Sequence, residues 1–282
     1  MVNDYHTPVL VDAVLQYLPT KHDGIYVDGT LGGGGHAEKI LVETSPHGKL
    51  IGFDVDEEAL IHARNRLRQF GDRVMYFQDN YSNVHTKLKS VGIERIHGLL
   101  IDLGVSSRQL DEIDRGFSFQ QDSRLDMRMN RSQSLDAWMV VNTYDKEQLS
   151  RLFWEYGEER NSRHIAKRVT EARLQGPINT TRDLAGIVAA AVGNRFLTKS
   201  MARIFQAIRI EVNNELASLE LSLDRIVDLL AQGGRIVVIS YHSLEDRIVK
   251  NFFKKESQRE IPSGTPLLPA QRGNPRLNVL TK

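Results

Sequence analysis

The residues best suited to chemistry are acids, glycines and a histidine that follow short apolar runs near the start of the chain. Asp28 is followed by Gly-Thr-Leu, four consecutive glycines at 32–35, and His36. Four glycines in a row raise the entropic cost of folding, so they indicate a ligand that approaches the main chain closely. Asp54 ends the next apolar run, where a carboxylate can accept both hydroxyls of a ribose. This pattern predicts a nucleoside-bearing cofactor, whereas a simple tight turn would leave Asp54 unexplained.

The identity of the cofactor depends on how many nucleotide-binding halves the chain offers. A dinucleotide such as NAD needs a pyrophosphate site and usually a second half, whereas S-adenosylmethionine carries no phosphate and needs one half. An acid–amide pair, Asp79 and Asn80, follows the third apolar run, where an adenine edge would lie. The pattern favours S-adenosylmethionine, and an NAD-dependent oxidoreductase is the alternative.

Further polar residues follow two later apolar runs. Asp102 ends the run at 96–102, and Tyr241 and His242 follow the run at 235–240. Asp102 could accept a hydrogen bond from a substrate, or it could cap a loop. The residues after His242 could cap the helix that follows. His242 and Glu245 have no third ligand at a suitable spacing, so we expect no metal site.

Basic residues gather in two places. Between Arg115 and Met129 they stand beside aromatics, which suits stacked bases and phosphates, but neighbouring aspartates could pair with the arginines and order this loop instead. From Arg247 to Lys282 there are eight Lys or Arg against two Glu, which favours a polyanion, although a solvated helix and tail fits equally well. The candidate nucleic-acid contacts are Arg115, Phe117, Phe119, Arg124, Arg128, Arg247 and Lys250.

Strands and helices must position these residues. The first hundred positions alternate between short apolar runs and amphipathic segments, which predicts a parallel sheet with helices on both faces. Ligands bind at the carboxyl ends of such strands, where Asp28, Asp54 and Asp102 lie. The predicted strands are 25–28, 49–54, 73–78 and 96–102, and the predicted helices are 36–43, 57–70 and 82–90, the last beginning at an N-cap serine.

The pattern changes after residue 106. Residues 107–200 show no convincing strand, and helices are expected near 145–156, 161–174 and 180–193. One long helix is predicted from Phe205 to Leu230, ended by Gly233 and Gly234. A strand at 235–240, a helix at 244–255 and an irregular, proline-containing tail from Ile261 follow. We therefore expect an α/β doubly wound sheet in residues 1–106 and 201–282, with an all-helical insertion at 107–200.

Composition excludes several function classes. The 282 residues include no cysteine, so disulfides, thiolate metal sites and cysteine nucleophiles are ruled out. The net charge of +1 excludes a general polycation, and no apolar run approaches the ~18 residues of a membrane span. A cytoplasmic location is expected.

Together these strings resemble the bacterial 16S rRNA (cytosine-N4)-methyltransferase family. The resemblance implies a class I, Rossmann-like S-adenosylmethionine-binding core with an inserted substrate-recognition domain, and a cytidine of 16S rRNA in the small ribosomal subunit as substrate. The matching strings are His6-Thr-Pro-Val-Leu, Asp28-Gly-Thr with Gly-Gly-His36, Asp102-Leu-Gly-Val-Ser-Ser, Arg115-Gly-Phe-Ser-Phe, Leu125-Asp-Met-Arg-Met, Tyr156-Gly-Glu-Glu-Arg160, Phe205-Gln-Ala-Ile-Arg-Ile and His242-Ser-Leu-Glu-Asp-Arg-Ile-Val-Lys250.

The resemblance also implies site residues. The positions that match the family's cofactor contacts are Gly34, Gly35, His36, Asp54, Tyr81, Asp102 and Gln109. Two departures stand out. The chain has Asp122-Ser-Arg-Leu where the family usually has Asp-Gly-Pro-Leu, and the chain stops soon after Asn274-Pro-Arg276 where the family's tail usually continues.

The absence of cysteine bears on the reaction. Methylation at carbon 5 of cytosine normally uses a thiolate, whereas the exocyclic amine needs no covalent adduct. Its lone pair is delocalised, so an acceptor for the amino hydrogens would help. We expect Asp102, or a carbonyl of the 102–106 turn, to be that acceptor, and Tyr241 and His242 to sandwich or orient a base that has left its stack. A non-catalytic ribosome-assembly binder is a further alternative, and the oligomeric state, a homodimer included, is left open.

Overall fold

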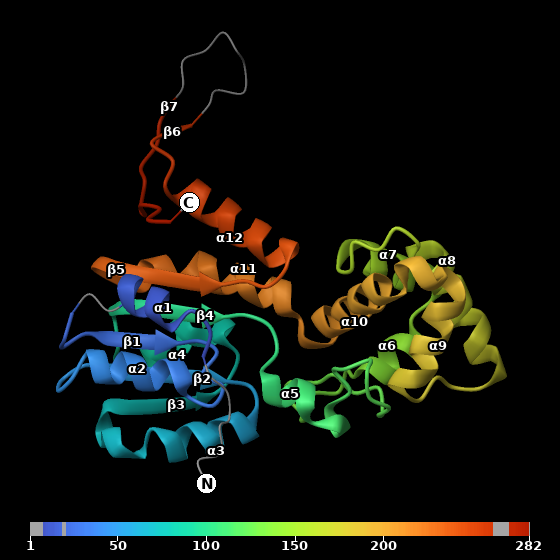
Figure 1. The fold of residues 1–282 in the computed structure, drawn as a ribbon. Coiled ribbons are helices and arrows are strands. Elements are labelled where there is room, and N and C mark those ends of the chain that lie inside the picture. The colour runs from blue at the N-terminus through green and yellow to red at the C-terminus, as the bar shows by residue number, and fades with distance from the viewer. Residues whose placement is uncertain (1–7, 19–20, 262–270, 282) are drawn as a thin grey trace. The chain divides into compact units, whose positions relative to one another are not determined.

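The computed structural model describes residues 8–18, 21–261 and 271–281, so His6 and Thr7 of the first matching string lie outside the described residues. Figure 1 shows the elements of two compact units. The sheet unit comprises Pro8–Asp54, Ala63–Gly104 and the described residues from Leu216 onward. The helical unit comprises, in its described part, Val55–His62 and Val105–Glu215.

The sheet unit is built on a parallel sheet. Among the described residues it has five strands in the order β3-β2-β1-β4-β5, and every neighbouring pair is parallel. The carboxyl ends of the strands therefore share one edge, which we call the sheet edge. The strands are β1 (Ile25–Asp28), β2 (Lys49–Asp54), β3 (Val74–Gln78), β4 (Ile96–Asp102) and β5 (Leu230–Ile239).

Alternate residues of each buried strand point to opposite faces of the sheet. Both faces are therefore apolar, and helices cover both of them. Val27 and Leu99 face a core shared with Leu223 and Phe252. On the other face, an added Cβ at Gly98 would meet the side chain of Leu18. The flanking helices are α1 (Val11–Tyr17), α2 (Gly35–Glu43), α3 (Glu57–Arg66), α4 (Val84–Ser90), α11 (Glu215–Ile226) and α12 (Ser243–Glu256).

The helical unit has its own core. Phe153, Ile165 and Ile204 are fully buried in it, and Asp145 and Thr180 begin two of its helices with reciprocal capping boxes. Its helices are α5 (Ser107–Asp111), α6 (Ala137–Thr143), α7 (Lys146–Glu155), α8 (Ser162–Ala172), α9 (Thr181–Val192) and α10 (Leu197–Asn213). Short 3-10 helices occur in both units. Those of the sheet unit lie at 68–73, 81–83 and 227–229, and those of the helical unit lie at 113–115, 173–175 and 194–196.

The predicted single helix from Phe205 to Leu230 is wrong. Asn214 adopts a left-handed conformation (φ 51°) and separates α10 from α11. Asparagine tolerates this conformation better than most residues do. Phe205 packs in the core of the helical unit, whereas Leu219 packs in the core of the sheet unit. The apolar spacing runs on across the break because each half follows the same helical period.

Three smaller predictions also need correction. Gly233 and Gly234 do not end a helix; they lie inside β5, where the register with β4 shifts between Ile96 and Gly98 as at a bulge. Ser82 does not cap the helix after β3, because the side chain of Asn80 accepts the hydrogen bond there. In the tail, β6 (Glu260–Ile261) pairs with β7 (Gln271–Arg272), and the predicted irregular stretch at 262–270 lies outside the described residues.

Candidate active site

The glycine segment after β1 is pinned to the ends of neighbouring strands. The backbone N–H of Gly29 donates to the carbonyl of Leu100 (2.8 Å), and that of Leu31 donates to the carbonyl of Phe53 (2.8 Å). Gly32 has a φ of 52°, a conformation that favours glycine, and its N–H donates to Oδ2 of Asp54 (2.7 Å). The glycine loop and the acid of β2 therefore form one unit at the sheet edge.

Tyr81 lies beside this loop. It begins the 3-10 helix that follows β3, and a Cβ added to Gly29 would lie 3.0 Å from the Cβ of Tyr81. The preceding Asp79 receives a hydrogen bond from Asn83 (2.7 Å) and pairs with Lys87 (3.1 Å). Burial would raise the pKa of Asp79, but these partners outweigh burial and hold it below its usual range. Asp79 is therefore an anionic brace for this turn.

A second group of polar side chains surrounds Thr30. The backbone N–H of Thr30 donates to Oδ1 of Asp28 (3.1 Å), and its hydroxyl accepts the backbone N–H of Asp102 (2.7 Å). Sequence reasoning missed Thr30, although its place two residues after Asp28 is the signal of a turn closed by an aspartate side chain. Thr30 thus links the end of β1 to the end of β4.

Asp28 and His36 carry buried polar atoms without hydrogen bonds. Asp28 is 1% exposed, and its Oδ2 has no hydrogen-bond partner in the part of the chain that the structure describes. Nδ1 of the buried His36 likewise has none among those residues. Burial is the main cause that raises the pKa of Asp28 to about 7. Because native proteins pair nearly all buried polar groups, these atoms are available to a ligand that reaches the sheet edge.

Asp102, the last residue of β4, contacts two other side chains at the sheet edge. The hydroxyl of Tyr241 donates to its Oδ1 (2.9 Å), and Nε2 of His36 lies 3.6 Å from its Oδ2. Burial, the charge of Asp102 and this hydrogen bond raise the pKa of Tyr241, so the phenol keeps its proton at neutral pH. Tyr241 is nonetheless 57% exposed. The structure thus brings together three predicted residues, with the carboxylate of Asp102 held between a phenol and an imidazole.

His242, predicted to orient the base, begins the helix that follows β5. His242 is the N-cap of α12, its Nδ1 accepts the N–H of Glu245 at 3.5 Å, and its Nε2 lies 3.1 Å from Oε1 of Glu245. The other oxygen of Glu245 accepts the backbone N–H of Tyr241 (2.9 Å). His242 therefore fixes the turn that carries Tyr241, and its contact with a base stays a prediction.

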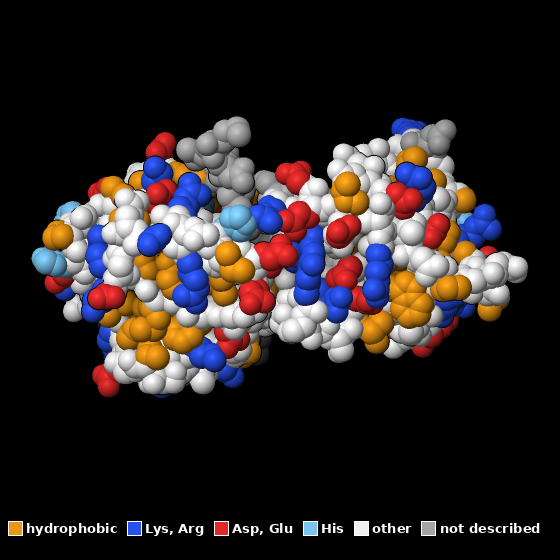
Figure 2. All heavy atoms as spheres, turned by 90° about the horizontal axis from the view of Figure 1, so that it is seen from below, with side chains coloured by type: hydrophobic (Ala, Val, Ile, Leu, Met, Phe, Trp, Pro, Cys, Tyr) orange, Lys and Arg blue, Asp and Glu red, His pale blue; other side chains and the backbone are white. Residues whose placement is uncertain are grey.

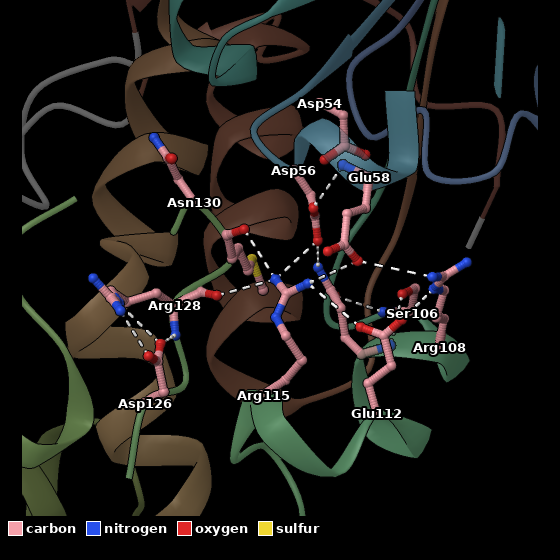
Figure 3. A network of polar contacts seen from close by, with 12 residues as sticks. Asp54, Asp56, Glu58, Ser106, Arg108, Glu112, Arg115, Asp126, Arg128 and Asn130 are labelled. Atoms are coloured by element: carbon pink, nitrogen blue, oxygen red, sulfur yellow. Dashed lines mark hydrogen bonds and ion pairs between the residues drawn. The ribbon is translucent and has the colours of Figure 1, made fainter. Parts of the chain in front are cut away.

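Arg115, a predicted nucleic-acid contact, is instead the centre of a buried network in the helical unit (Figure 3). Its side chain is 2% exposed, and one terminal nitrogen lies 2.8 Å from Oδ2 of Asp56. The other terminal nitrogen lies 4.0 Å from Glu58 and 3.8 Å from Glu112. Gln109 donates to the same oxygen of Asp56 (3.1 Å). The prediction for Arg115 is wrong because its guanidinium is enclosed by acids.

The aromatic residues of the same loop also pack inward. Phe117 is buried in the core of the helical unit, and Phe119 meets the ring of Phe205 edge-on at 5.5 Å between centroids. Arg128 forms a bidentate pair with Asp126 (2.7 and 2.9 Å). The alternative that aspartates order this loop is thus confirmed for Arg128. The predicted base stacking by the buried Phe117 is wrong, and that by the partly exposed Phe119 stays a prediction.

Other predicted contacts remain exposed. Arg124 pairs with Asp136 (3.1 Å) but keeps most of its side chain in solvent. Lys250 pairs with Asp246 (2.8 Å) on α12 and is also exposed, as is Arg247. Their contact with nucleic acid stays a prediction.

The strand order defines an α/β protein with a parallel sheet, a class of protein in which ligands bind at the carboxyl ends of the strands. A model of the MraW methylase family matches residues 3–282. The chain therefore belongs to the MraW methylase family.

A named relative agrees with this placement. A protein of Fusobacterium nucleatum named ribosomal RNA small subunit methyltransferase H is 48% identical over 252 residues, which cover 89% of this chain and 80% of that protein. Among solved structures, an RNA methyltransferase from Salinibacter ruber in complex with S-adenosyl-L-homocysteine is 20% identical, covers 45% of this chain and 82% of its own, and has a TM-score of 0.27. TrmN from Thermus thermophilus is 17% identical, covers 38% of this chain and 31% of its own, and has a TM-score of 0.31.

The part of the chain that the structure describes has no helix with the length and apolar character needed to span a membrane.

Proposed function

We propose that the protein transfers a methyl group from S-adenosylmethionine to the exocyclic N4 amino group of a cytidine in the 16S rRNA of the small ribosomal subunit. The family and the name of the relative from Fusobacterium nucleatum support the reaction class and the RNA. The observation that carries the chemistry is the carboxylate of Asp102, held between Tyr241 and His36 at the sheet edge.

The residues at the edge fit S-adenosylmethionine. Oδ2 of Asp28 and Nδ1 of His36 are buried polar atoms without hydrogen bonds among the described residues, and Asp54 stands where a ribose would be recognised. In this proposal Gly34, Gly35 and His36 line the methionine end, and Tyr81 lies beside the adenine. When bound, S-adenosylmethionine supplies an electrophilic methyl group on a sulfonium.

Asp102 would compensate for the poor nucleophilicity of the cytosine N4 amine. The lone pair on N4 of cytosine is delocalised into the ring, so the amine attacks poorly. A carboxylate that accepts an N4 hydrogen localises this lone pair and stabilises the positive charge that develops on nitrogen. Tyr241 fixes one oxygen of Asp102 by donating to it. The base must leave its stack to reach the edge, and the exposed ring of Tyr241 is the surface it would meet there.

Methyl transfer to isolated small subunits tests the proposal. Purified protein is incubated with labelled S-adenosylmethionine and small subunits that lack the modification, and the RNA is digested to nucleosides. We expect label in N4-methylcytidine from 16S rRNA and none from large subunits. Label in 5-methylcytidine, or protein that binds the subunits without transferring label, would contradict the proposal.

A further inference from the structure

A hollow on the helical unit lies outside the site described above. It is formed by α7 and α8, and its lining combines five basic side chains with one acid and one tryptophan. The lining residues are Lys146, Glu147, Ser150, Arg151, Trp154, Arg160, Ser162, Arg163 and Lys167.

The arginines of this hollow are not neutralised. Arg151, Arg160 and Arg163 are exposed, and within the described residues none of them forms an ion pair or a side-chain hydrogen bond. Arg115 and Arg128, by contrast, are enclosed by acids. The face drawn in Figure 2 mixes basic and acidic side chains. In the hollow, Lys146 pairs with Glu147 and Lys167 with Glu171, so the excess of positive charge comes from the three arginines.

A rigid turn holds Arg160 at this hollow. A Cβ added to Gly157 would lie 2.7 Å from the carbonyls of Phe153 and Arg203, so only glycine fits. The next residue, Glu158, has a φ of 49°. Buried Glu159 accepts hydrogen bonds from the N–H of Asn161 (2.8 Å) and the hydroxyl of Ser200 (2.9 Å). This turn is the Tyr156–Arg160 string, and its contacts hold the backbone of Arg160 beside the hollow.

Trp154 adds a flat apolar surface to these charges. It is 58% exposed, whereas the indole of Trp138, the other tryptophan, donates to Asn179 (3.0 Å). An aromatic ring beside unpaired arginines suits an unpaired base flanked by phosphates. An acidic protein surface would use the charges but would have less need of the ring.

We infer that this hollow binds ribosomal RNA, with Arg160 and Arg163 at phosphates and Trp154 stacked on an unpaired base. The inference rests on the proposed function, since it names a surface that would hold the RNA whose cytidine is methylated.

The kinetic test removes two charges. In Arg160→Gln/Arg163→Gln we expect KM for small subunits to rise about tenfold, with kcat and cofactor affinity unchanged, and the salt dependence of binding to weaken by about 1.4 in log–log slope, as for two lost phosphate contacts on a single strand. The control, Arg168→Gln/Lys199→Gln, removes two exposed charges from the same unit outside the hollow. Equal KM values for the two variants would overturn the inference.

A binding test is independent of methyl transfer. In Trp138→Phe, Trp154 is the sole tryptophan, and we expect fragments of 16S rRNA to quench its fluorescence. We also expect Trp154→Ala to raise KM and Trp154→Phe to restore it in part. If RNA quenches the fluorescence but the parent protein transfers no methyl group, the proposed function is refuted while the inference that the hollow binds RNA still holds. Fluorescence that responds to RNA-free small-subunit proteins and not to RNA would overturn the inference.

Discussion

The sheet unit and the helical unit each bury a cluster of charged groups, and the clusters differ in how their charges are balanced. Both terminal nitrogens of Arg115 have acidic partners, while its Nε has no hydrogen bond among the described residues. At the sheet edge, Oδ2 of Asp28 and Nδ1 of His36 have no hydrogen bond among the described residues. The contrast is therefore one of charge. Acids surround the guanidinium of Arg115, which stabilises the fold, whereas burial raises the pKa of Asp28, whose Oδ2 would gain a partner from a bound ligand.

The largest expected effect is on the chemistry at the edge. Asp102→Asn removes the anionic acceptor but keeps the size of the side chain. We expect single-turnover methyl transfer to slow about a thousandfold, in the range found when a transition-state stabilising group is lost. Calorimetry should show cofactor affinity within a fewfold of the parent protein. Lost binding with normal single-turnover chemistry at saturating cofactor would show that Asp102 only binds the cofactor.

The role of the Arg115 network is tested by the free energy of unfolding and not by methyl transfer. Arg115→Met leaves Asp56 buried without its cation, so we expect the free energy of unfolding to fall by about 3 kcal/mol or more. Urea unfolding followed by tryptophan fluorescence reports on the helical unit, which holds both tryptophans. The control is Arg182→Met, whose exposed pair with Asp122 should contribute less than about 1 kcal/mol. Similar losses in the two variants would contradict the assigned role of Arg115.

The same comparison shows what the sequence could predict. The four early strands begin and end within a residue of their predicted bounds, because apolar periodicity is local. Glu112 is a local partner of Arg115, but its other two acidic partners are not. Asp56 and Glu58 lie more than fifty positions earlier, and an arginine beside aromatics gives the same local pattern whether its charge is buried or exposed. The break at Asn214 cannot be seen in the apolar pattern because both helices keep one spacing.

Asp28 should make stability depend on pH. Its pKa is raised to about 7 in the folded protein, mainly by burial, while an unfolded aspartate titrates near ~3.9. Between these values the folded state binds more protons, so the stability this group contributes is present at low pH and is lost as pH rises to about 7.

Asp28→Asn cannot titrate and should lose this dependence. Between about pH 4 and 7 the free energy of unfolding of the parent protein should fall more steeply than that of the variant, by up to ~1.4 kcal/mol per pH unit. Urea unfolding at a series of pH values measures both slopes, and Asp224→Asn, at an exposed acid of α11, is the control. Parallel slopes for the parent and Asp28→Asn would contradict the raised pKa.

The smallest expected effect is at Tyr241. Tyr241→Phe keeps the ring that a base would meet and removes the hydrogen bond to Oδ1 of Asp102. Since Tyr241 is half exposed, water can replace the lost donor in part, and we expect kcat to fall about fivefold, near ~1 kcal/mol. Cofactor affinity should not change, and Tyr241→Ala should also raise KM because the ring is lost. If Tyr241→Phe changed KM and left kcat intact, the phenol would serve the substrate directly and not the positioning of Asp102.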